Sequence, residues 1–370
     1  MKCKVLQENV RTALQYVAKA IPAKPQLAIL NSVLVDVQGQ YIEFAATDLY
    51  VGMRSKVMGT VTEPGKLAVP GKTLVEVINS LPAGPMEMET TDTVLTITAA
   101  GVKMTIPSVS SDEYPAFPES SGEEVTLTQE QLSFLDSGLI FCTSADTTRI
   151  VLTTLLFDFQ AEHLQVVATD GFRLATALYP QANSLSTPQR LLVSAKALAE
   201  VCHIAQQEKV EKLQFMVSRE LKQLTCTINQ TEVFLRLVEG EYPPFEKIMP
   251  QGLTFEAEWD GEEWLTQLKR ALIFARESSN IIKLSFTPES VTLTATSATQ
   301  GTFTGSLPIK VLKGTEATIA FNGRYLMDFV THLKPSQVWF GMSESLKPAL
   351  FRPRGADHYS YVVMPFRVNE

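Results

Sequence analysis

The sequence lacks a long apolar run and is poor in cysteine. No apolar run approaches the roughly 20 residues that a membrane-spanning helix needs. The first residues, Met1–Val5, lack the apolar core of a signal peptide, so we expect a cytoplasmic protein. The 4 cysteines lie far apart and form no Cys-x-x-Cys pair, which predicts buried, reduced thiols instead of a disulfide framework.

The sequence also lacks the residue clusters that catalysis requires. Its 4 histidines are isolated, and neither Gly-x-Ser-x-Gly nor Gly-x-Gly-x-x-Gly occurs. Residues 65–73 end in Gly-Lys-Thr, as a phosphate-binding loop does. However, five residues separate the two glycines where that loop has four, and Pro70 has no backbone N–H to offer a phosphate. We therefore predict no catalytic site, metal or cofactor, and a nucleotide-using enzyme is the rival hypothesis.

The net charge of −8 argues against bulk attraction to nucleic acid. Phosphate binding normally needs a basic surface, which an acidic chain does not offer over its whole area. A protein that gathers a few cations on one surface and is acidic elsewhere remains compatible with this composition. Net charge alone does not separate these two cases.

A short phrase recurs three times along the chain. Ala-Thr-Asp begins at residues 46 and 168, and Ala-Thr-Ser begins at residue 295. A strand-like run that turns into a helix follows each phrase, at residues 67–70, 191–194 and 318–322, and Tyr-Pro-Ala-Phe at 114–117 matches Tyr-Pro-Pro-Phe at 242–245. Because unrelated features share one spacing, we predict three copies of one fold, with domains at residues 1–121, 125–248 and 250–370.

Each copy has the same predicted elements. Helical periodicity opens each one, at residues 9–20, 129–139 and 262–274, and returns after the strand-like run, at 73–81, 195–205 and 324–333. Asp260 stands where it would cap the third opening helix. Runs such as 94–98 and 291–295 alternate apolar and polar residues, which is typical of antiparallel strands with one wet face. The fold class is therefore α+β, with two helices on a largely antiparallel sheet in each domain.

Several segments resemble one family. Residues 168–175 (ATDGFRLA), 239–245 (EGEYPPF), 321–326 (FNGRYL) and the ending 361–368 (YVVMPFRV) are similar to bacterial DNA polymerase III beta subunits, the sliding clamps. The start of the chain, with Lys24–Asn31, is similar to the first domain of that family. The resemblance covers the whole chain, and its terminal motif is highly specific.

The resemblance implies a non-catalytic processivity factor of the DNA polymerase III holoenzyme. Two chains would join head to tail into a homodimeric ring of six similar domains, with helices inward around double-stranded DNA and sheets outward. A clamp loader would open the ring. DNA polymerases and repair proteins would dock on it through a short peptide with glutamine and hydrophobic anchors.

The resemblance also implies residues for each role. A peptide-binding pocket between the second and third domains is expected at Leu152, Thr169, Gly171, Phe172, Arg173, Leu174, Pro243, Lys247, Ile248, Asn322, Tyr325, Leu346, Val363, Met364, Pro365, Phe366 and Arg367. Residues expected to face DNA are Lys24 and Lys196, followed by Arg11 and Lys19 from the polar face of the first helix. The dimer interface is expected to involve Met104 and Lys103 on one side, and Ile273 and Phe274 on the other.

Some positions depart from the family pattern. Asp146 stands where a neutral residue is expected, Asn79 where a basic residue is common, and Ser279 where an aromatic residue is expected. Residues 296–304 contain no carboxylate to pair with the basic residues around Lys103. These departures keep open an alternative hypothesis, in which the chain is an adaptor with the same fold and peptide pocket that forms no ring.

Overall fold

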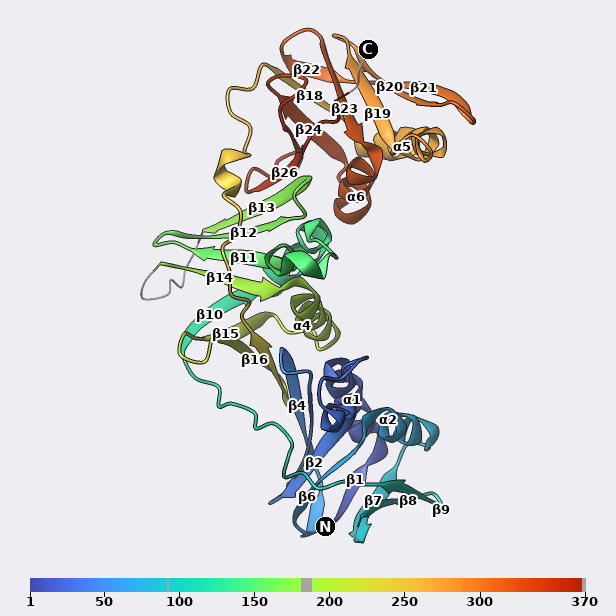
Figure 1. Ribbon diagram of the computed structural model, residues 1–370, viewed down its shortest axis with the longest axis vertical. Coiled ribbons are helices and arrows are strands. Elements are labelled where there is room, and N and C mark those ends of the chain that lie inside the picture. The colour runs from blue at the N-terminus through green and yellow to red at the C-terminus, as the bar shows by residue number, and fades with distance from the viewer. Residues whose placement is uncertain (92, 181–187, 368–370) are drawn as a thin grey trace. The chain divides into compact units, whose positions relative to one another are not determined.

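The computed structural model describes residues 1–91, 93–180 and 188–367 (Figure 1). The chain forms two compact units. Unit 1 consists of Met1–Leu132 and Ala197–Leu237, and unit 2 of Ser133–Lys196 and Val238–Glu370. The chain passes between the units inside the helices α3 (Gln129–Gly138) and α4 (Ala195–Gln207) and after Leu237.

Unit 1 contains two antiparallel sheets. Its strands are β1 (Lys2–Leu6), β2 (Ser32–Gln38), β3 (Tyr41–Thr47), β4 (Val51–Met58), β5 (Thr60–Glu63), β6 (Gly65–Pro70), β7 (Pro85–Thr91), β8 (Val94–Ala99), β9 (Val102–Pro107), β10 (Glu123–Thr128), β15 (Lys212–Ser218), β16 (Gln223–Ile228) and β17 (Thr231–Arg236). One sheet has the order β5-β1-β7-β8-β9 and the other β10-β15-β16-β17-β4-β3-β2-β6. The second sheet therefore runs without a break from the first copy of the repeat into the second.

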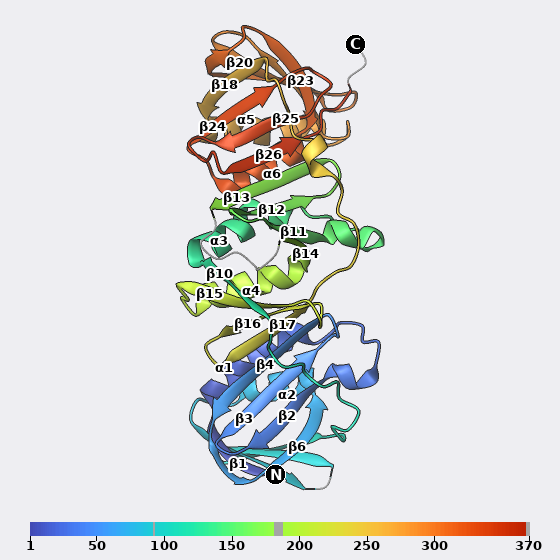
Figure 2. The same cartoon turned by 90° about the vertical axis from the view of Figure 1, so that its left-hand side faces the viewer.

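The helices of the first copy lie on one face of this sheet. Helix α1 (Gln7–Val17) contacts β3 and β4, and helix α2 (Gly71–Ser80) contacts β2 and β6. In Figure 2 the strands β2, β3 and β6 face the viewer, and the helices lie behind them. Val10, Leu14 and Val17 are buried, so the predicted apolar stripe is the face that packs on the sheet.

Unit 2 also has two antiparallel sheets. Its strands are β11 (Thr154–Phe159), β12 (His163–Thr169), β13 (Arg173–Pro180), β14 (Gln189–Ser194), β18 (Phe255–Asp260), β19 (Ile281–Phe286), β20 (Ser290–Ser297), β21 (Gly301–Pro308), β22 (Lys310–Lys313), β23 (Ala317–Asn322), β24 (Gln337–Met342), β25 (Ala349–Pro353) and β26 (Tyr359–Val363). The orders are β14-β11-β12-β13-β26-β25-β24-β18-β22 and β21-β20-β19-β23. Here the sheet is continuous from the second copy into the third, through β13 and β26. The α+β class and antiparallel sheets predicted from the sequence are confirmed.

The helices begin close to their predicted positions. Helix α1 starts two residues early and ends at Val17, where a 3-10 turn (Ala18–Ala20) completes the predicted segment. Helix α5 (Gly261–Ala275) is capped as predicted, because the Asp260 carboxylate accepts hydrogen bonds from the N–H groups of Glu262 (2.9 Å) and Glu263 (2.8 Å). Helix α6 (Gly323–Leu333) follows β23 directly.

The recurring Ala-Thr-Asp phrase forms the same turn in the first two copies. Thr47 Oγ1 donates to the carbonyl of Val51 (2.9 Å), and Asp48 accepts from the N–H of Tyr50 (2.9 Å). In the second copy, Thr169 Oγ1 donates to the carbonyl of Arg173 (2.6 Å), and Asp170 accepts from the N–H of Phe172 (2.9 Å). Side chains that hydrogen-bond backbone two to four residues on stabilise such turns. The phrase is therefore a structural signature of the strand connections β3–β4 and β12–β13.

The Gly-Lys-Thr segment is a strand-to-helix turn and not a phosphate loop. Strand β6 ends at Pro70, and helix α2 starts at Gly71. A Cβ at Gly71 would lie 2.5 Å from Ile21 Cδ1, and one at Gly323, the equivalent first residue of α6, would lie 2.3 Å from Ile282 Cδ1. Close packing accounts for both glycines, so neither needs a nucleotide to explain it.

All four cysteines are buried and free, as the sequence predicted. Burial raises the pKa of the Cys3 thiol to about 11 and raises the pKa of Cys142 well above its usual range. Such thiols stay protonated and unreactive near neutral pH. In the described residues, no helix is long and apolar enough to cross a membrane.

Candidate functional site

Large apolar side chains are exposed in unit 2 near Val363 of β26, which pairs with Arg173 of β13 on one side and with Ala349, just after Leu346, on the other. Phe172 is 56% exposed, Leu346 59%, Met364 42% and Phe366 43%. We call these four residues the unit 2 apolar surface. Exposed apolar groups that lie close together are typical of sites that bind another molecule.

Backbone hydrogen bonds hold this surface together. The N–H of Met364 donates to the carbonyl of Phe172 (2.9 Å), directly beyond the paired residues Arg173 and Val363. The N–H of Phe366 donates to the carbonyl of Ala320 in β23 (2.7 Å). The segment 364–366 therefore lies between β23 of the third copy and the turn that carries Phe172.

Part of the predicted pocket lies beneath this surface and not on it. Leu152, Thr169, Leu174 and Val363 are all buried. Leu174 belongs to a core cluster with Val362 and Phe245, against which Ile248 packs. The remaining predicted residues are half-buried or exposed: Gly171, Pro243, Lys247, Asn322, Tyr325, Pro365 and Arg367. The buried residues form a firm floor, and the exposed ones are those that a ligand meets first.

Arg173 is occupied by groups of its own chain. Its guanidinium donates to Asp170 (3.1 Å), to Asp328 and to the carbonyl of Phe141 (2.8 Å), and it lies 4.9 Å from the Tyr325 ring centre. Its side chain is only 10% exposed. Arg173, expected in the peptide-binding pocket, thus links the second copy to the third through Asp328 and Tyr325.

Two other predicted residues also have structural partners. The Asn322 side chain accepts a hydrogen bond from the N–H of Arg324 (3.0 Å) and so caps helix α6. The backbone carbonyl of Tyr325 accepts from the Tyr361 hydroxyl (2.9 Å). Burial raises the pKa of Tyr361 well above its usual range, which keeps this hydroxyl protonated. Both residues fix the position of α6 beside Phe172, whose ring stacks on that of Tyr325 at 6.5 Å.

The junction in unit 1 repeats the same backbone arrangement. The N–H of Arg236, the last residue of β17, donates to the carbonyl of Tyr50 (2.8 Å), as the N–H of Met364 does to the carbonyl of Phe172. Arg54 and Glu232 stand directly opposite each other in β4 and β17, and their side chains form an ion pair. Arg54 also lies over the Phe234 ring, 5.1 Å from its centre. This pair could not be predicted, because nothing in the sequence indicates which strands meet at a junction.

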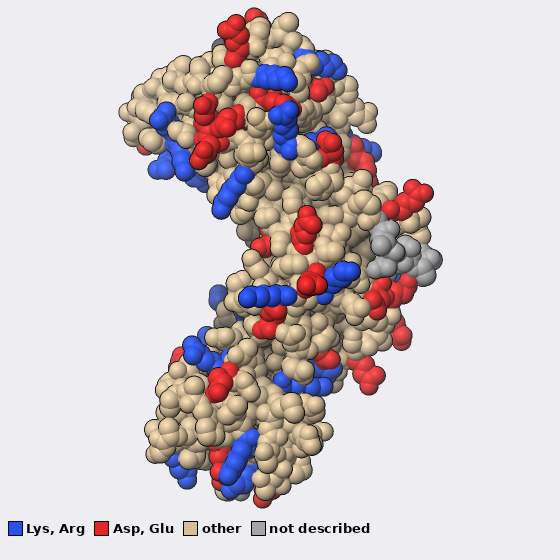
Figure 3. Space-filling view, turned by 180° about the vertical axis from the view of Figure 1, so that it is seen from behind, with Lys and Arg blue, Asp and Glu red and all other residues tan. Residues whose placement is uncertain are grey.

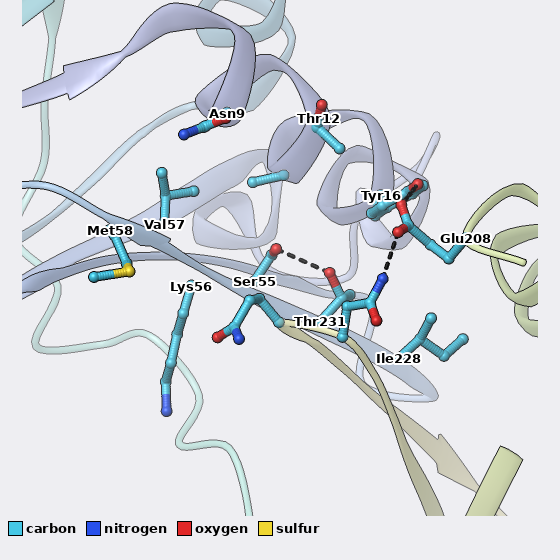
Figure 4. Close-up of a pocket in the computed structure, with 13 residues that line it drawn as sticks. Asn9, Thr12, Tyr16, Ser55, Lys56, Val57, Met58, Glu208, Ile228 and Thr231 are labelled. Carbon is cyan, nitrogen blue, oxygen red and sulfur yellow. Dashed lines mark hydrogen bonds between the residues drawn. The ribbon is translucent and has the colours of Figure 1, made fainter. Parts of the chain in front are cut away.

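A cavity of about 340 Å³ lies at this junction, between α1 and the β16–β17 turn (Figure 4). The polar groups that line it largely satisfy one another. The Tyr16 hydroxyl donates to Glu208, which also accepts from Asn229 Nδ2 (2.5 Å), and Ser55 is hydrogen-bonded to Thr231 (2.9 Å). These internal hydrogen bonds therefore hold the parts of the junction together around the cavity.

The cations expected to face DNA have different surroundings. Lys24, Lys196 and Arg11 are exposed, whereas Lys19 forms an ion pair with Glu200. On the face drawn in Figure 3, basic and acidic side chains alternate over a largely uncharged surface. Asp146, one of the departures from the family pattern, has a local role, because its carboxylate accepts hydrogen bonds from Thr148 N (3.0 Å) and Oγ1 (2.7 Å). These bonds hold the pKa of Asp146 below its usual value.

The residues expected at a dimer interface lie on two sheet edges. Lys103 and Met104 are in β9, the last strand of the five-stranded sheet, and β21 is the last strand of the four-stranded sheet. Ile273, on helix α5 beside β21, is 57% exposed, and Phe274 stacks on Phe303 of β21 at 6.2 Å. Each edge offers unpaired backbone groups next to accessible apolar side chains.

Comparisons with known proteins agree over the whole chain. Residues 1–118, 126–244 and 246–367 match the models of the N-terminal, central and C-terminal domains of the DNA polymerase III beta subunit. The beta sliding clamps of Staphylococcus aureus (strain Mu50 / ATCC 700699) and Chlamydia muridarum are each 26% identical to this chain; the alignments cover 99% of both proteins for the first and 100% of both for the second. The crystal structure of the DNA polymerase III subunit beta from Pseudomonas aeruginosa superposes with a TM-score of 0.92 at 24% identity, covering 99% of this chain and 100% of that one. The last comparison shows the fold.

Proposed function

This chain belongs to the DNA polymerase III beta subunit family, and from that membership we propose how its repeats produce its function. Members of the family are beta sliding clamps, the non-catalytic processivity factors of DNA polymerase III, and this is the function of the chain. We propose that two copies join head to tail into a closed ring around duplex DNA. Each copy would contribute three domains, at residues 1–121, 125–248 and 250–370, and the ring would work in the cytoplasm.

The two junctions inside the chain predict how the ring closes. Met53 of β4 pairs with Ala46 of β3 and, across the junction, with Val233 of β17. Ala175 of β13 pairs with Ala168 of β12 and, across the second junction, with Tyr361 of β26. The strand β21 is the third equivalent of β4 and β13, and it has no such partner in the described part of the chain.

The same equivalence supports β9 of a second copy as the partner of β21. Strand β9 follows a two-residue hairpin turn, as β17 does, so Val102 is equivalent to Thr231 and Met104 to Val233. Phe303 pairs with Ala295 and is therefore the equivalent of Met53. We infer that β9 of one copy pairs with β21 of the other, with Met104 opposite the other copy's Phe303 and Lys103 opposite its Thr304.

The side chains at these two edges suit this pairing. Met104 would meet the apolar surface formed by Phe303, Phe274 and Ile273, and burial of such groups drives association. A head-to-tail contact closes into a ring only when its rotation divides the circle. Six similar domains joined by similar strand pairs meet that condition.

Enclosure also explains why an acidic chain can act on DNA. A closed ring is retained because it is linked to the duplex, so a few cations such as Lys24 and Lys196 suffice for weak, sequence-independent phosphate contacts that allow sliding. We expect a clamp loader to place the protein on nicked circular DNA, where gel filtration will find it bound. Linearising the circle should release it. Retention on the linear form, or no retention on the circle, would contradict enclosure.

We propose that the unit 2 apolar surface binds polymerases and repair proteins through a short peptide with glutamine and hydrophobic anchors. Met364 is exposed and flexible, which suits different apolar anchors, and the buried floor beneath it is rigid. Met364→Ala should weaken binding of a polymerase tail peptide about tenfold, as loss of a central apolar contact does. Leu312→Ala, at an exposed leucine of β22, is the matched control. Equal affinities in fluorescence anisotropy would show that the peptide binds elsewhere.

One observation favours an adaptor that forms no ring. In the proposed contact between β9 and β21, Thr304 and Lys103 stand where Arg54 and Glu232 form an ion pair in unit 1. The contact between two copies therefore lacks an ion pair at this position. Light scattering at micromolar concentration distinguishes the two functions. A dimer supports the clamp, whereas a monomer at every concentration supports the adaptor.

A further inference from the structure

A second cavity in unit 1 lies at the junction between β4 and β17, where the linker after the first copy crosses the sheet. Its volume is about 320 Å³. The aromatic rings of Tyr50, Phe117 and Phe234 line it together with Leu221. Tyr50 is 52% exposed and Leu221 44%. The rings of Phe117 and Phe234 are 5.5 Å apart. The cavity is thus open to solvent and largely aromatic.

Polar groups of one kind converge on this aromatic cavity. Gln223 lines it, is 8% exposed and carries a buried Nε2 with no hydrogen-bond partner among the described residues. A buried donor without a partner is costly, so an acceptor on a ligand in the cavity would lower that cost. Arg236, also in the lining, is exposed, and no ion pair of its guanidinium is found in the described part of the chain. Both groups donate hydrogen bonds, and one is positively charged.

The cavity has the same frame as the unit 2 apolar surface but different chemistry. Tyr50 is the equivalent of Phe172, and Arg236 is the equivalent of Met364, since each pair is joined by the same backbone hydrogen bond. Gly52 replaces Leu174, and a Cβ there would lie 2.8 Å from Phe117 Cε1, so the glycine makes room for the Phe117 ring. In unit 1 the Phe117 ring therefore occupies the position of the Leu174 side chain and forms part of the cavity wall.

We propose that this cavity is a second docking site, for a peptide segment of a partner protein in which an acidic side chain adjoins an apolar one. The apolar side chain would pack among Tyr50, Phe117 and Leu221. The carboxylate would accept hydrogen bonds from Arg236 and Gln223, which a charged acceptor makes stronger than a neutral one does. The inference stands on the residues of unit 1 and does not require that the unit 2 apolar surface binds a peptide.

The test uses the full chain with isotopically labelled leucine and methionine methyl groups. The probe is the blocked pentapeptide acetyl-Gly-Asp-Leu-Gly-Ser-amide, and its matched control has asparagine in place of aspartate. We expect saturable shifts of the Leu49 and Leu221 methyl signals, both from the cavity lining, and binding about tenfold weaker for the asparagine peptide. Shifts confined to Leu346 and Met364, or equal affinities for the two peptides, would overturn the proposal.

Two variants separate a binding role from a structural one. Arg236→Glu should abolish the shifts, and Arg219→Glu, an exposed arginine that pairs with Glu123, should leave them unchanged. Gln223→Leu removes the unpartnered donor, so it should raise the thermal unfolding midpoint while weakening peptide binding several-fold. A Gln223→Leu protein that is more stable and binds equally well would show that this side chain has no part in the site. Because the Leu346 and Met364 signals report on unit 2 separately, failure at one site is distinguishable from failure at the other.

Discussion

The two junctions inside the chain use the same strand pairing and different side chains. In unit 1, β4 and β17 are joined by the partly exposed pair Arg54 and Glu232. In unit 2, β13 and β26 are joined around the buried Tyr361 and the nearly buried Arg173. The backbone pairing of the edge strands therefore determines that two copies join, and the side chains determine the strength of the junction. At the proposed third junction, Lys103 faces Thr304, so that junction has neither an ion pair like that of unit 1 nor a buried cluster like that of unit 2. We therefore expect the third junction to be the weakest of the three and the place where the ring opens.

The largest difference between the junctions should appear when their arginines are removed. Arg173→Ala removes the guanidinium that donates to Asp170, Asp328 and the Phe141 carbonyl, and should lower the free energy of unfolding of unit 2 by about 3 kcal/mol. Arg54→Ala removes a more exposed pair and should cost about 1 kcal/mol.

Denaturant unfolding measures both changes. Trp259, Trp264 and Trp339, the only tryptophans of the sequence, lie in unit 2, so fluorescence reports on that unit. Circular dichroism follows the whole chain. Equal costs for Arg173→Ala and Arg54→Ala would contradict the distinction between a nearly buried arginine and a partly exposed one.

Disruption of the third junction should act on assembly and not on folding. Met104→Asp places a charge opposite the aromatic surface at Phe303 and Phe274, and should raise the dimer dissociation constant at least about 100-fold. Analytical ultracentrifugation measures it. Met58→Asp, at a methionine that is 66% exposed and far along β4, is the control and should dimerise normally. If both variants dimerise like the unmodified chain, β9 is not the closing strand.

Restoring an ion pair should make the third junction resemble the first. Thr304→Glu would place a carboxylate opposite Lys103 and tighten the dimer about threefold at low salt, because cross-strand ion pairs of this kind contribute modestly. Thr304→Gln has the same shape without the charge and should leave affinity unchanged. The gain should disappear at high salt. Equal effects of glutamate and glutamine would contradict the proposed register.

The smallest effect concerns the tyrosines of the two internal junctions. Burial, followed by the hydrogen bond to Glu208, raises the pKa of Tyr16 to about 12. Since the folded pKa exceeds the unfolded value near 10, the stabilisation is complete below about pH 10 and is lost as pH rises toward 12. Ultraviolet titration of the chain and of Tyr16→Phe should differ by one tyrosinate that forms in this interval. Tyr359 and Tyr361 of unit 2, whose pKa values burial raises well above the usual range, should ionise only on unfolding. A Tyr16 that titrates at the ordinary value would contradict the buried hydrogen bond.

The sequence predicted the repeat and most of its elements because local patterns encode them. Ala-Thr-Asp marks turns, and Tyr114 and Tyr242 of the matching phrases both hydrogen-bond strand carbonyls, at Ala45 (3.3 Å) and Val167 (3.3 Å). The pairing of β4 with β17 could not be read from the sequence, since edge strands of every copy have similar patterns. The engagement of Arg173 and the unpartnered amide of Gln223 depend on three-dimensional neighbours that no spacing reveals.

The central claim is that β9 and β21 of two copies pair in one register and close a ring, and cysteine cross-linking tests it directly. The four native thiols are buried, so introduced cysteines are the accessible ones. Oxidation of the double variant Lys103→Cys, Thr304→Cys should give covalent dimers alone, whereas Lys103→Cys with Ser306→Cys, two residues out of register, should stay monomeric under denaturing conditions. Cross-linking of the out-of-register pair, a ladder of longer polymers, or no covalent dimer from the in-register pair would contradict the account.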